Sequence, residues 1–256
     1  METTADGTLY RARRRALIRA GSGKIVPFSD SSIALKFLAF DTATEWCSAA
    51  LWVDDVCTHR EIHAGQKHSD LLVPMLMDLL SESALSLEQL DAIVYGMGPG
   101  SFTGLRIACG VAQGLALGAN LPVLGISTLE TLAEESGEDK VLACLDARMN
   151  EVYAALYQRD NAAWRCLAGP LVCPPNAVPR PEGDDFIGVG SGFATYPAIA
   201  TAHGLSRMDA SIIPHARAMA RLAVPRLLRG EGVSAENAEP FYIRDKVALK
   251  ICERGV

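Results

Sequence analysis

One stretch decides how the chain folds: Gly98-Pro99-Gly100-Ser101-Phe102-Thr103-Gly104-Leu105-Arg106. It follows an apolar run over 92–95 that is typical of a buried strand, and it precedes an Ala-, Gly- and Leu-rich segment that favours a helix over 107–118. A glycine-rich turn from strand to helix leaves backbone N–H groups free at the positive end of the helix, which is a general anion site. Ser101 and Thr103 could cap that helix or contact a phosphate. Because no Lys follows Gly104, the stretch is not a Walker A loop.

The composition indicates a folded protein that does not bind nucleic acid through a broad basic surface. Of 256 residues, 49% are hydrophobic and 21% are charged, enough for one large domain or two smaller ones. The net charge is −6, whereas neutralising phosphates needs clustered Lys and Arg. No apolar run approaches the length of a membrane span. The seven cysteines include no Cys-x-x-Cys pair, which favours reduced thiols in the cytoplasm over disulfides or a zinc site.

Residues 1–35 differ from the rest of the chain. They carry six basic and three acidic residues and lack periodic apolar spacing. This composition predicts a disordered basic tail, or residues translated from an upstream start. Two alternatives are a basic arm that contacts RNA and an organelle-targeting peptide, although Glu2 and Asp6 count against the latter.

The folded part opens with a hairpin that has a polar turn. A buried strand over 37–40 leads into Asp41-Thr42-Ala43-Thr44-Glu45, and strands over 46–52 and 56–61 follow. An apolar strand that ends in Asp-Thr before a small-residue hairpin resembles the phosphate loop of actin-like ATPases. Many ordinary hairpins also carry Asp-Thr, because both residues stabilise turns. The candidate vestigial phosphate or nucleotide site consists of Asp41, Thr42, Thr44, Gly98, Gly100 and Ser101.

Two helices of the first unit have unusual surfaces. The first, over 69–82 with Ser69 as its expected N-cap, is apolar almost all the way round, so it is deeply buried or packed on two sides. The second, over 101–118, carries Gly110, Gly114 and Gly118 on one stripe. Since glycine is a poor helix former, this stripe indicates a close approach by another backbone. The glycines could pack on their own sheet or contact a partner protein.

A second unit begins after the polar break at 137–140. A strand over 141–146, a turn with Asn150 in a left-handed position and a returning strand over 151–157 repeat the opening hairpin. We expect Asp146 and Arg148 to stabilise this turn rather than form a polar site. A helix over 214–229 carries four arginines on a solvated flank or an RNA-facing one: Arg217, Arg221, Arg226 and Arg229. The repeated order predicts an α/β protein of two ribonuclease-H-like lobes, over 36–138 and 139–256, with the last segment returning to the first lobe.

Five ordered motifs and a C-terminal signature together resemble one known family. They are FDTATEWCSAAL (40–51), GPGSFTGLR (98–106), AQGLA (112–116), GISTL (125–129), DARMNEVY (146–153) and EPFYIRD (239–245). Over about 36–250 the chain resembles the TsaB (YeaZ) family of glycoprotease-like (peptidase M22) proteins, which serve the bacterial synthesis of threonylcarbamoyladenosine in tRNA.

The resemblance implies an actin-like fold and a role as a non-catalytic scaffold in the cytoplasm. It implies binding to the catalytic subunit TsaD, association with the ATPase TsaE, homodimer formation, and contact with tRNA through the complex. No cofactor is expected on the chain alone, with ATP or ADP and Mg²⁺ as an alternative in the assembled complex. Family members pair through two helices, which implies an interface of Leu71, Leu72, Met75, Leu79, Leu105, Arg106, Cys109, Gly110, Gln113 and Gly114.

Departures from related patterns bear on catalysis. The metal-binding His pair of TsaD-like proteins is matched here by Thr128 and Leu132, and leucine cannot bind a metal. Met97 stands where many relatives have Arg. We therefore expect neither catalytic nor metal-binding residues. Two enzyme readings remain as alternatives: an actin-like kinase or hydrolase using Asp41, Thr42 and Ser101, and a metallopeptidase, which these residues disfavour.

Overall fold

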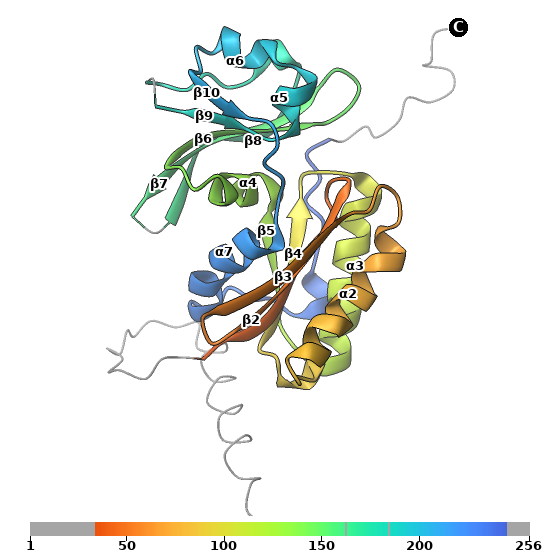
Figure 1. Ribbon diagram of the computed structural model, residues 1–256. Coiled ribbons are helices and arrows are strands. Elements are labelled where there is room, and N and C mark those ends of the chain that lie inside the picture. The colour runs from red at the N-terminus through yellow and green to blue at the C-terminus, as the bar shows by residue number, and fades with distance from the viewer. Residues whose placement is uncertain (1–33, 162, 184, 245–256) are drawn as a thin grey trace, which may run out of the picture.

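The computed structural model of the protein describes residues 34–244, except 162 and 184, as two α/β lobes (Figure 1). Of the tail expected over 1–35, residues 1–33 lie outside the described residues, while Leu35 packs in the core, so the tail ends earlier than predicted. The N-terminal lobe has a five-stranded sheet in the order β3-β2-β1-β4-β5. Its strands are β1 (Lys36–Asp41), β2 (Trp46–Val53), β3 (Val56–His63), β4 (Ala92–Gly98) and β5 (Val123–Ser127).

The C-terminal lobe repeats this topology. Its sheet has the order β10-β9-β6-β7-β8, and both sheets combine an antiparallel three-stranded unit with two parallel strands. The repeat of one lobe that the sequence predicts is therefore confirmed. The strands are β6 (Lys140–Asp146), β7 (Val152–Asp160), β8 (Ala163–Cys173), β9 (Ile187–Val189) and β10 (Arg207–Asp209), and the short helices α5 (Ser191–Thr195) and α6 (Ala198–Ala202) cover one face.

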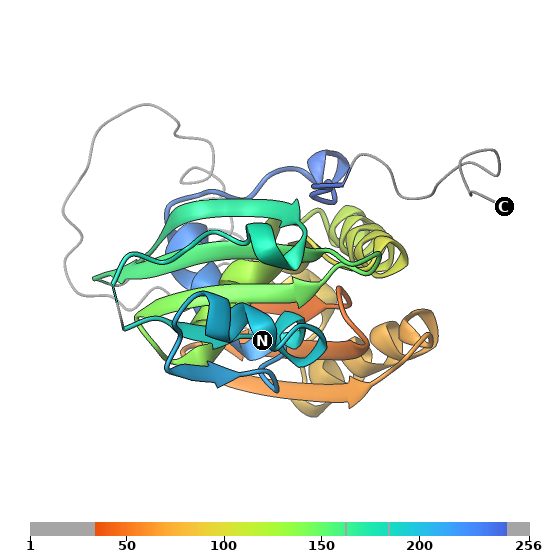
Figure 2. The same ribbon diagram turned by 90° about the horizontal axis from the view of Figure 1, so that it is seen from above.

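Helices α2 (His68–Glu82) and α3 (Phe102–Ala119) lie on the same face of the N-terminal sheet (Figures 1 and 2). Ser101 is the N-cap of α3, and its Oγ accepts from Gly104 N. The expected Ser69 cap of α2 is wrong, because Lys67 is the N-cap there and the Ser69 hydroxyl donates to Asp70 instead. By length and composition alone α3 could cross a membrane, but in the structure it packs on the sheet.

Two further helices, α4 (Thr128–Ser136) and α7 (Ala216–Leu228), lie between the lobes, and each packs on the sheet of the other half of the sequence. The apolar face of α4 packs against the C-terminal sheet, whereas α7 packs through Met219 and Ala220 against the N-terminal sheet, opposite α2 and α3. Ser48 of β2 orients α7, because its Oγ accepts from Ala216 N at 3.0 Å in the first turn. The packing therefore crosses the boundary that the sequence places at 138.

Three of the four arginines, Arg217, Arg221 and Arg226, form ion pairs with glutamates of α4. The solvated flank that the sequence predicts is therefore only partly present: Arg229 is 60% exposed, but the other three are engaged by the neighbouring helix. Arg221 Nε lies 2.8 Å from Glu134 Oε1. The side chains of Arg159 and Trp164 approach the same carboxylate at 3.0 and 2.9 Å. The remaining ion pairs along this face are Arg217–Glu135 and Arg226–Glu130, while Arg229 pairs locally with Glu231. The α4 partners of Arg217, Arg221 and Arg226 lie 82 to 96 residues away in the sequence, so helical spacing alone did not reveal them.

The chain after α7 returns along the N-terminal lobe. Val233 pairs with Val123 of β5, and a 3-10 turn follows at Ala235–Asn237. We name residues 238–244 the strap. At its start, Ala238 O accepts from Cys109 Sγ and Gln113 Nε2 of α3, at 3.3 and 3.0 Å.

Candidate functional site

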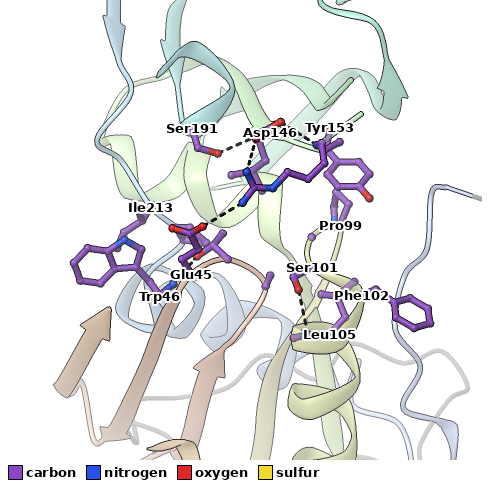
Figure 3. Close-up of a pocket in the computed structure, with 18 of the residues that line it drawn as sticks. Glu45, Trp46, Pro99, Ser101, Phe102, Leu105, Asp146, Tyr153, Ser191 and Ile213 are labelled. Atoms are coloured by element: carbon purple, nitrogen blue, oxygen red, sulfur yellow. Dashed lines mark hydrogen bonds and ion pairs between the residues drawn. The ribbon is translucent and has the colours of Figure 1, made fainter. Parts of the chain in front are cut away.

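A cleft of about 1170 Å³ lies between the two lobes (Figure 3). One wall consists of residues 43–46 at the β1–β2 turn and the loop that leads into α3. The other wall consists of the β6–β7 turn (147–151) and the start of α5. The strap and residues 210–214 complete the lining. Residues 99–105 of the sequence stretch that decides the fold therefore line this cleft.

The glycines of this loop are required for close packing against the β1–β2 turn. A Cβ on Gly100 would lie 2.5 Å from Ala43 O, and one on Gly104 would lie 1.9 Å from Thr42 O. The amide of Ser101 donates to Ala43 O at 2.7 Å. The Ser101 N–H group, which could have bound an anion, is thus already hydrogen-bonded within the protein.

Asp41 and Thr42 lie behind the cleft wall, not on it. Thr42 is fully buried, and its Oγ1 donates to Gly104 O at 2.7 Å. Asp41 is 1% exposed; its Oδ1 accepts from Ala43 N, and among the described residues its Oδ2 has no hydrogen-bond partner. Burial raises the pKa of Asp41 to about 7, against the smaller lowering effect of the Ala43 amide.

The six residues of the candidate phosphate site are therefore not brought together. Thr44, Gly100 and Ser101 line the cleft, while Asp41, Thr42 and Gly98 do not. A Cβ on Gly98 would lie 2.8 Å from Phe241 O of the strap. A nucleotide–Mg²⁺ complex held as in a phosphate loop needs an acidic oxygen that reaches the ligand, and Asp41 Oδ2 is buried against Gly96 instead. The residues present do not fit that group.

The opposite wall carries an open polar turn. Arg148, Met149 and Asn150 all have left-handed backbone, with φ of 61°, 56° and 59°, as expected for Asn150. Asp146 Oδ1 accepts from Arg148 N at 2.9 Å, so this pair stabilises the turn as expected. Sequence reasoning missed a second contact: Arg148 Nη2 lies 3.1 Å from Glu45 Oε1 across the cleft. Glu45 and Asp146 face each other from the two walls in Figure 3.

We name the solvent-exposed side of α2 and α3 the α2–α3 surface. This surface holds only part of the predicted partner interface. Four of its ten residues are core residues of this lobe: Leu72, Leu79, Leu105 and Cys109. Leu71 and Met75 are partly buried, and Gln113 binds the strap. Arg106, Gly110 and Gly114 are exposed. A Cβ on Gly110, Gly114 or Gly118 would meet nothing within 4 Å, so the alternative that these glycines pack on their own sheet is wrong.

An aromatic and arginine stack marks the start of this surface. Arg106 Cζ lies 3.8 Å from the ring centroid of Phe102, and Arg106 Nε donates to Tyr242 Oη at 2.9 Å. The two rings are 5.6 Å apart, with exposed fractions of 37% and 41%. Tyr242 comes from the strap, so spacing along α3 alone could not reveal it.

The described residues hold no cluster of metal ligands, and several of their thiols are buried. Among them, no three His, Cys, Asp or Glu side chains are placed to hold a metal ion. Thr128 and Leu132 are fully buried in α4. Burial, followed by the charge of Asp41, raises the pKa of Cys47 to about 12, and burial also raises the pKa of Cys109 and Cys144. Thiols in this condition are poor nucleophiles.

Two lobes of one topology around a cleft define the class: a two-lobed α/β protein of actin-like architecture. The family model described as "TsaD: tRNA N6-adenosine threonylcarbamoyltransferase" matches residues 61–250. The chain is 42% identical to "tRNA threonylcarbamoyladenosine biosynthesis protein TsaB" of Escherichia coli K12, over 84% of this chain and 97% of the relative. The TsaB of Haemophilus influenzae is 39% identical, over 84% of this chain and 96% of the relative.

Solved structures agree with this relationship. "YeaZ from Pseudomonas aeruginosa" superposes with a TM-score of 0.76 at 40% identity, over 81% of this chain and 99% of that one. A second Pseudomonas aeruginosa structure, titled as an uncharacterized protein with similarity to peptidase YEAZ, gives 0.77 at 40% identity, over 82% of this chain and 100% of that one. The chain belongs to the TsaB (YeaZ) family, and the resemblance inferred from the motifs is confirmed.

Proposed function

We propose that this protein serves the biosynthesis of threonylcarbamoyladenosine in tRNA as a non-catalytic subunit that binds and supports a TsaD-like transferase. The observation that carries the proposal is the near-complete coverage of two relatives named for this pathway. Asp41 is buried, and burial raises the pKa of the Cys47 and Cys144 thiols, so these groups favour a non-catalytic role over a catalytic one.

The two enzyme alternatives find little support in the site. An actin-like kinase or hydrolase would need Asp41 at the ligand, but its side chain is buried behind the cleft wall. A metallopeptidase would need metal ligands in α4, where Thr128 and Leu132 are buried. ATP turnover by the purified chain, or stoichiometric metal on elemental analysis, would restore one of these alternatives.

We place the partner surface on the outward stripe of α3 and the adjoining face of α2. Arg106, Gly110 and Gly114 recur at helical spacing, and glycines without neighbours allow a second helix to approach closely. Val73 and Met77 of α2 add exposed apolar area, each 39% exposed. Arginine and aromatic side chains are common where interfaces derive most of their affinity, which favours the stack at Arg106 as the anchor.

Further partners follow from the same assignment. A TsaE-like ATPase would join the complex, tRNA would be contacted through the complex, and a second copy of this chain would use the α2–α3 surface when the transferase is absent. A nucleotide at the assembled complex would take its metal ligands from the partner, because Asp41 does not reach the cleft. The compartment that fits this role is the cytoplasm.

The surface is tested by filling the glycine stripe. In the double variant Gly110→Leu and Gly114→Leu, both side chains enter open space, so the fold should keep its Tm while co-purification with the TsaD-like subunit is lost. Ala202→Leu on exposed α6 adds similar bulk far from the stripe and should bind normally. Undiminished pairing in the double variant would reject the surface.

The function is tested by reconstitution. The transferase, the ATPase, an enzyme that supplies the threonylcarbamoyl group and tRNA are combined with or without this chain. Mass spectrometry of tRNA nucleosides should detect the modified adenosine only when the chain is present. Equal modification without it would refute the proposed function.

A further inference from the structure

The strap is firmly bound to the N-terminal lobe along its first half. The Tyr95 hydroxyl of β4 both accepts from Glu239 N and donates to Glu239 O, each at 3.0 Å. Phe241 N donates to Met97 O at 2.6 Å, just beyond the glycine loop. Together with the bonds from α3 to Ala238, these contacts fix the strap beside β4 and α3.

The other end of the strap binds the C-terminal lobe. Arg244 Nη1 donates to Ala147 O at 3.0 Å, and its guanidinium forms an ion pair with Glu151. The Arg244 side chain is only 14% exposed, so solvent screens this contact less than it screens a surface pair. Ala147 and Glu151 bracket the β6–β7 turn, and Arg244 therefore binds both ends of the turn that forms the far wall of the cleft.

The middle of the strap meets the outward stripe of α3. Tyr242 accepts from Arg106 and packs against Phe102, as described above. Arg106 lies one helical turn before Gly110 and faces outward with it. A partner that occupies this stripe therefore meets Arg106, and Arg106 contacts the strap directly.

We propose that the strap couples the outer stripe of α3 to the position of the β6–β7 turn. A partner bound on α3 and the separation of the two cleft walls then influence each other, and this reciprocity is required because any coupling between two sites acts in both directions. The strap has two states, with Arg244 either bound to the turn or released from it. The effect of a bound partner rests on the proposed function, whereas the link from Arg106 to the β6–β7 turn concerns this chain alone.

The first test removes the far end of the strap in the full-length chain. Arg244→Ala should speed amide hydrogen exchange over 147–152 about tenfold, because hydrogen bonds to a charged group are lost there. Arg229→Ala is the matched control, since Arg229 pairs with Glu231 two residues away, and it should leave that exchange unchanged. Wild-type exchange in Arg244→Ala would overturn the proposal.

The second test perturbs the α3 end and reads the same turn. Arg106→Ala should speed exchange in the strap and, about threefold, over 147–152, because Arg106 binds Tyr242 of the strap. Faster exchange in the strap with an unchanged turn would show a local effect and overturn the coupling.

The third arm adds the TsaD-like subunit. Saturating subunit should slow exchange over 147–152 in the wild type but not in Arg244→Ala. Binding without any change at the turn would refute the coupling and leave the proposed function standing. If the subunit does not bind, the proposed function fails, and the Arg106→Ala result decides the coupling by itself.

Discussion

The two lobes place an aspartate at the same point of one topology, and its surroundings differ completely. Asp41 ends β1, is 1% exposed and packs its carboxylate against Gly96 of β4. The neighbouring Ala43 and Thr42 are closely approached by Gly100 and Gly104 at the start of α3. Asp146 ends β6 beside the short helix α5, where its amide donates to Ser191 Oγ at 3.1 Å and its carboxylate binds Arg148. The first turn is thus a packed structural element, and the second is an exposed polar turn that lines the cleft. A shared topology therefore does not decide whether the turn after the first strand of a lobe is buried or exposed to the cleft.

The largest expected effect comes from Gly104, where α3 meets the β1–β2 turn. In Gly104→Ala the new Cβ would lie 1.9 Å from Thr42 O, so the backbone must shift and the Thr42 bond is lost. Unfolding by urea should show a loss of about 4 kcal/mol. Gly110→Ala in open space of the same helix should gain about 0.5–1 kcal/mol. Equal behaviour of the two variants would mean that the turn is not tightly packed.

The next effect concerns the proton on Asp41. Its folded-state pKa of about 7 lies above the ordinary 3.8, so folding favours the protonated carboxyl. The stability that this proton contributes is fully present below pH 3.8 and is lost as pH rises through 7. Between pH 4 and 8 the wild type should lose about 3 kcal/mol that Asp41→Asn does not lose. Denaturant midpoints measured across this range check the difference. Parallel pH profiles for the two proteins would place Asp41 in contact with water.

A smaller effect is expected at the equivalent turn of the other lobe. Ser191→Ala removes the hydroxyl that accepts from Asp146 N and should cost about 1 kcal/mol, because the amide can turn toward water in the cleft. Urea unfolding measures the cost. A loss as large as that of Gly104→Ala would contradict the difference between the two turns.

The smallest effect is expected at the contact that joins the turns. The side chains of Arg148 and Glu45 are 74% and 62% exposed. Arg148→Gln should change the unfolding free energy by about 0.5 kcal/mol or less, and the change should vanish in high salt. A loss that persists in high salt would indicate a more buried contact between the lobes.

Local patterns were sufficient for the central elements and the repeat of lobes, but they did not predict β8 or β10. The apolar runs before Asp41 and Gly98 are central strands, and Ser101 caps α3, because each depends on neighbours in sequence. The motifs also identified the family, since several short patterns in fixed order are more specific than one glycine loop.

The remaining features depend on contacts between distant segments. The α7 arginines look like a solvated flank until α4 supplies Glu134 some 87 residues earlier. Asp41 resembles a phosphate-loop residue until the structure buries its carboxylate against Gly96 of β4. Likewise, Leu72 and Leu105 resemble contact residues by type, but the helix faces that carry them pack inward.

Because α4 and α7 each pack on the sheet of the other half of the sequence, the protein should not divide into two stable fragments. A fragment that ends at the polar break over 137–140 would contain α4 but lack α7, leaving bare the sheet face that Met219 and Ala220 cover. The complementary fragment would contain α7 with nothing to pack against and a C-terminal sheet without Leu129 and Leu132. Exposed apolar faces of this kind drive aggregation. We therefore expect the two lobes to fold as one unit, and a protease cut at the break should leave both halves associated.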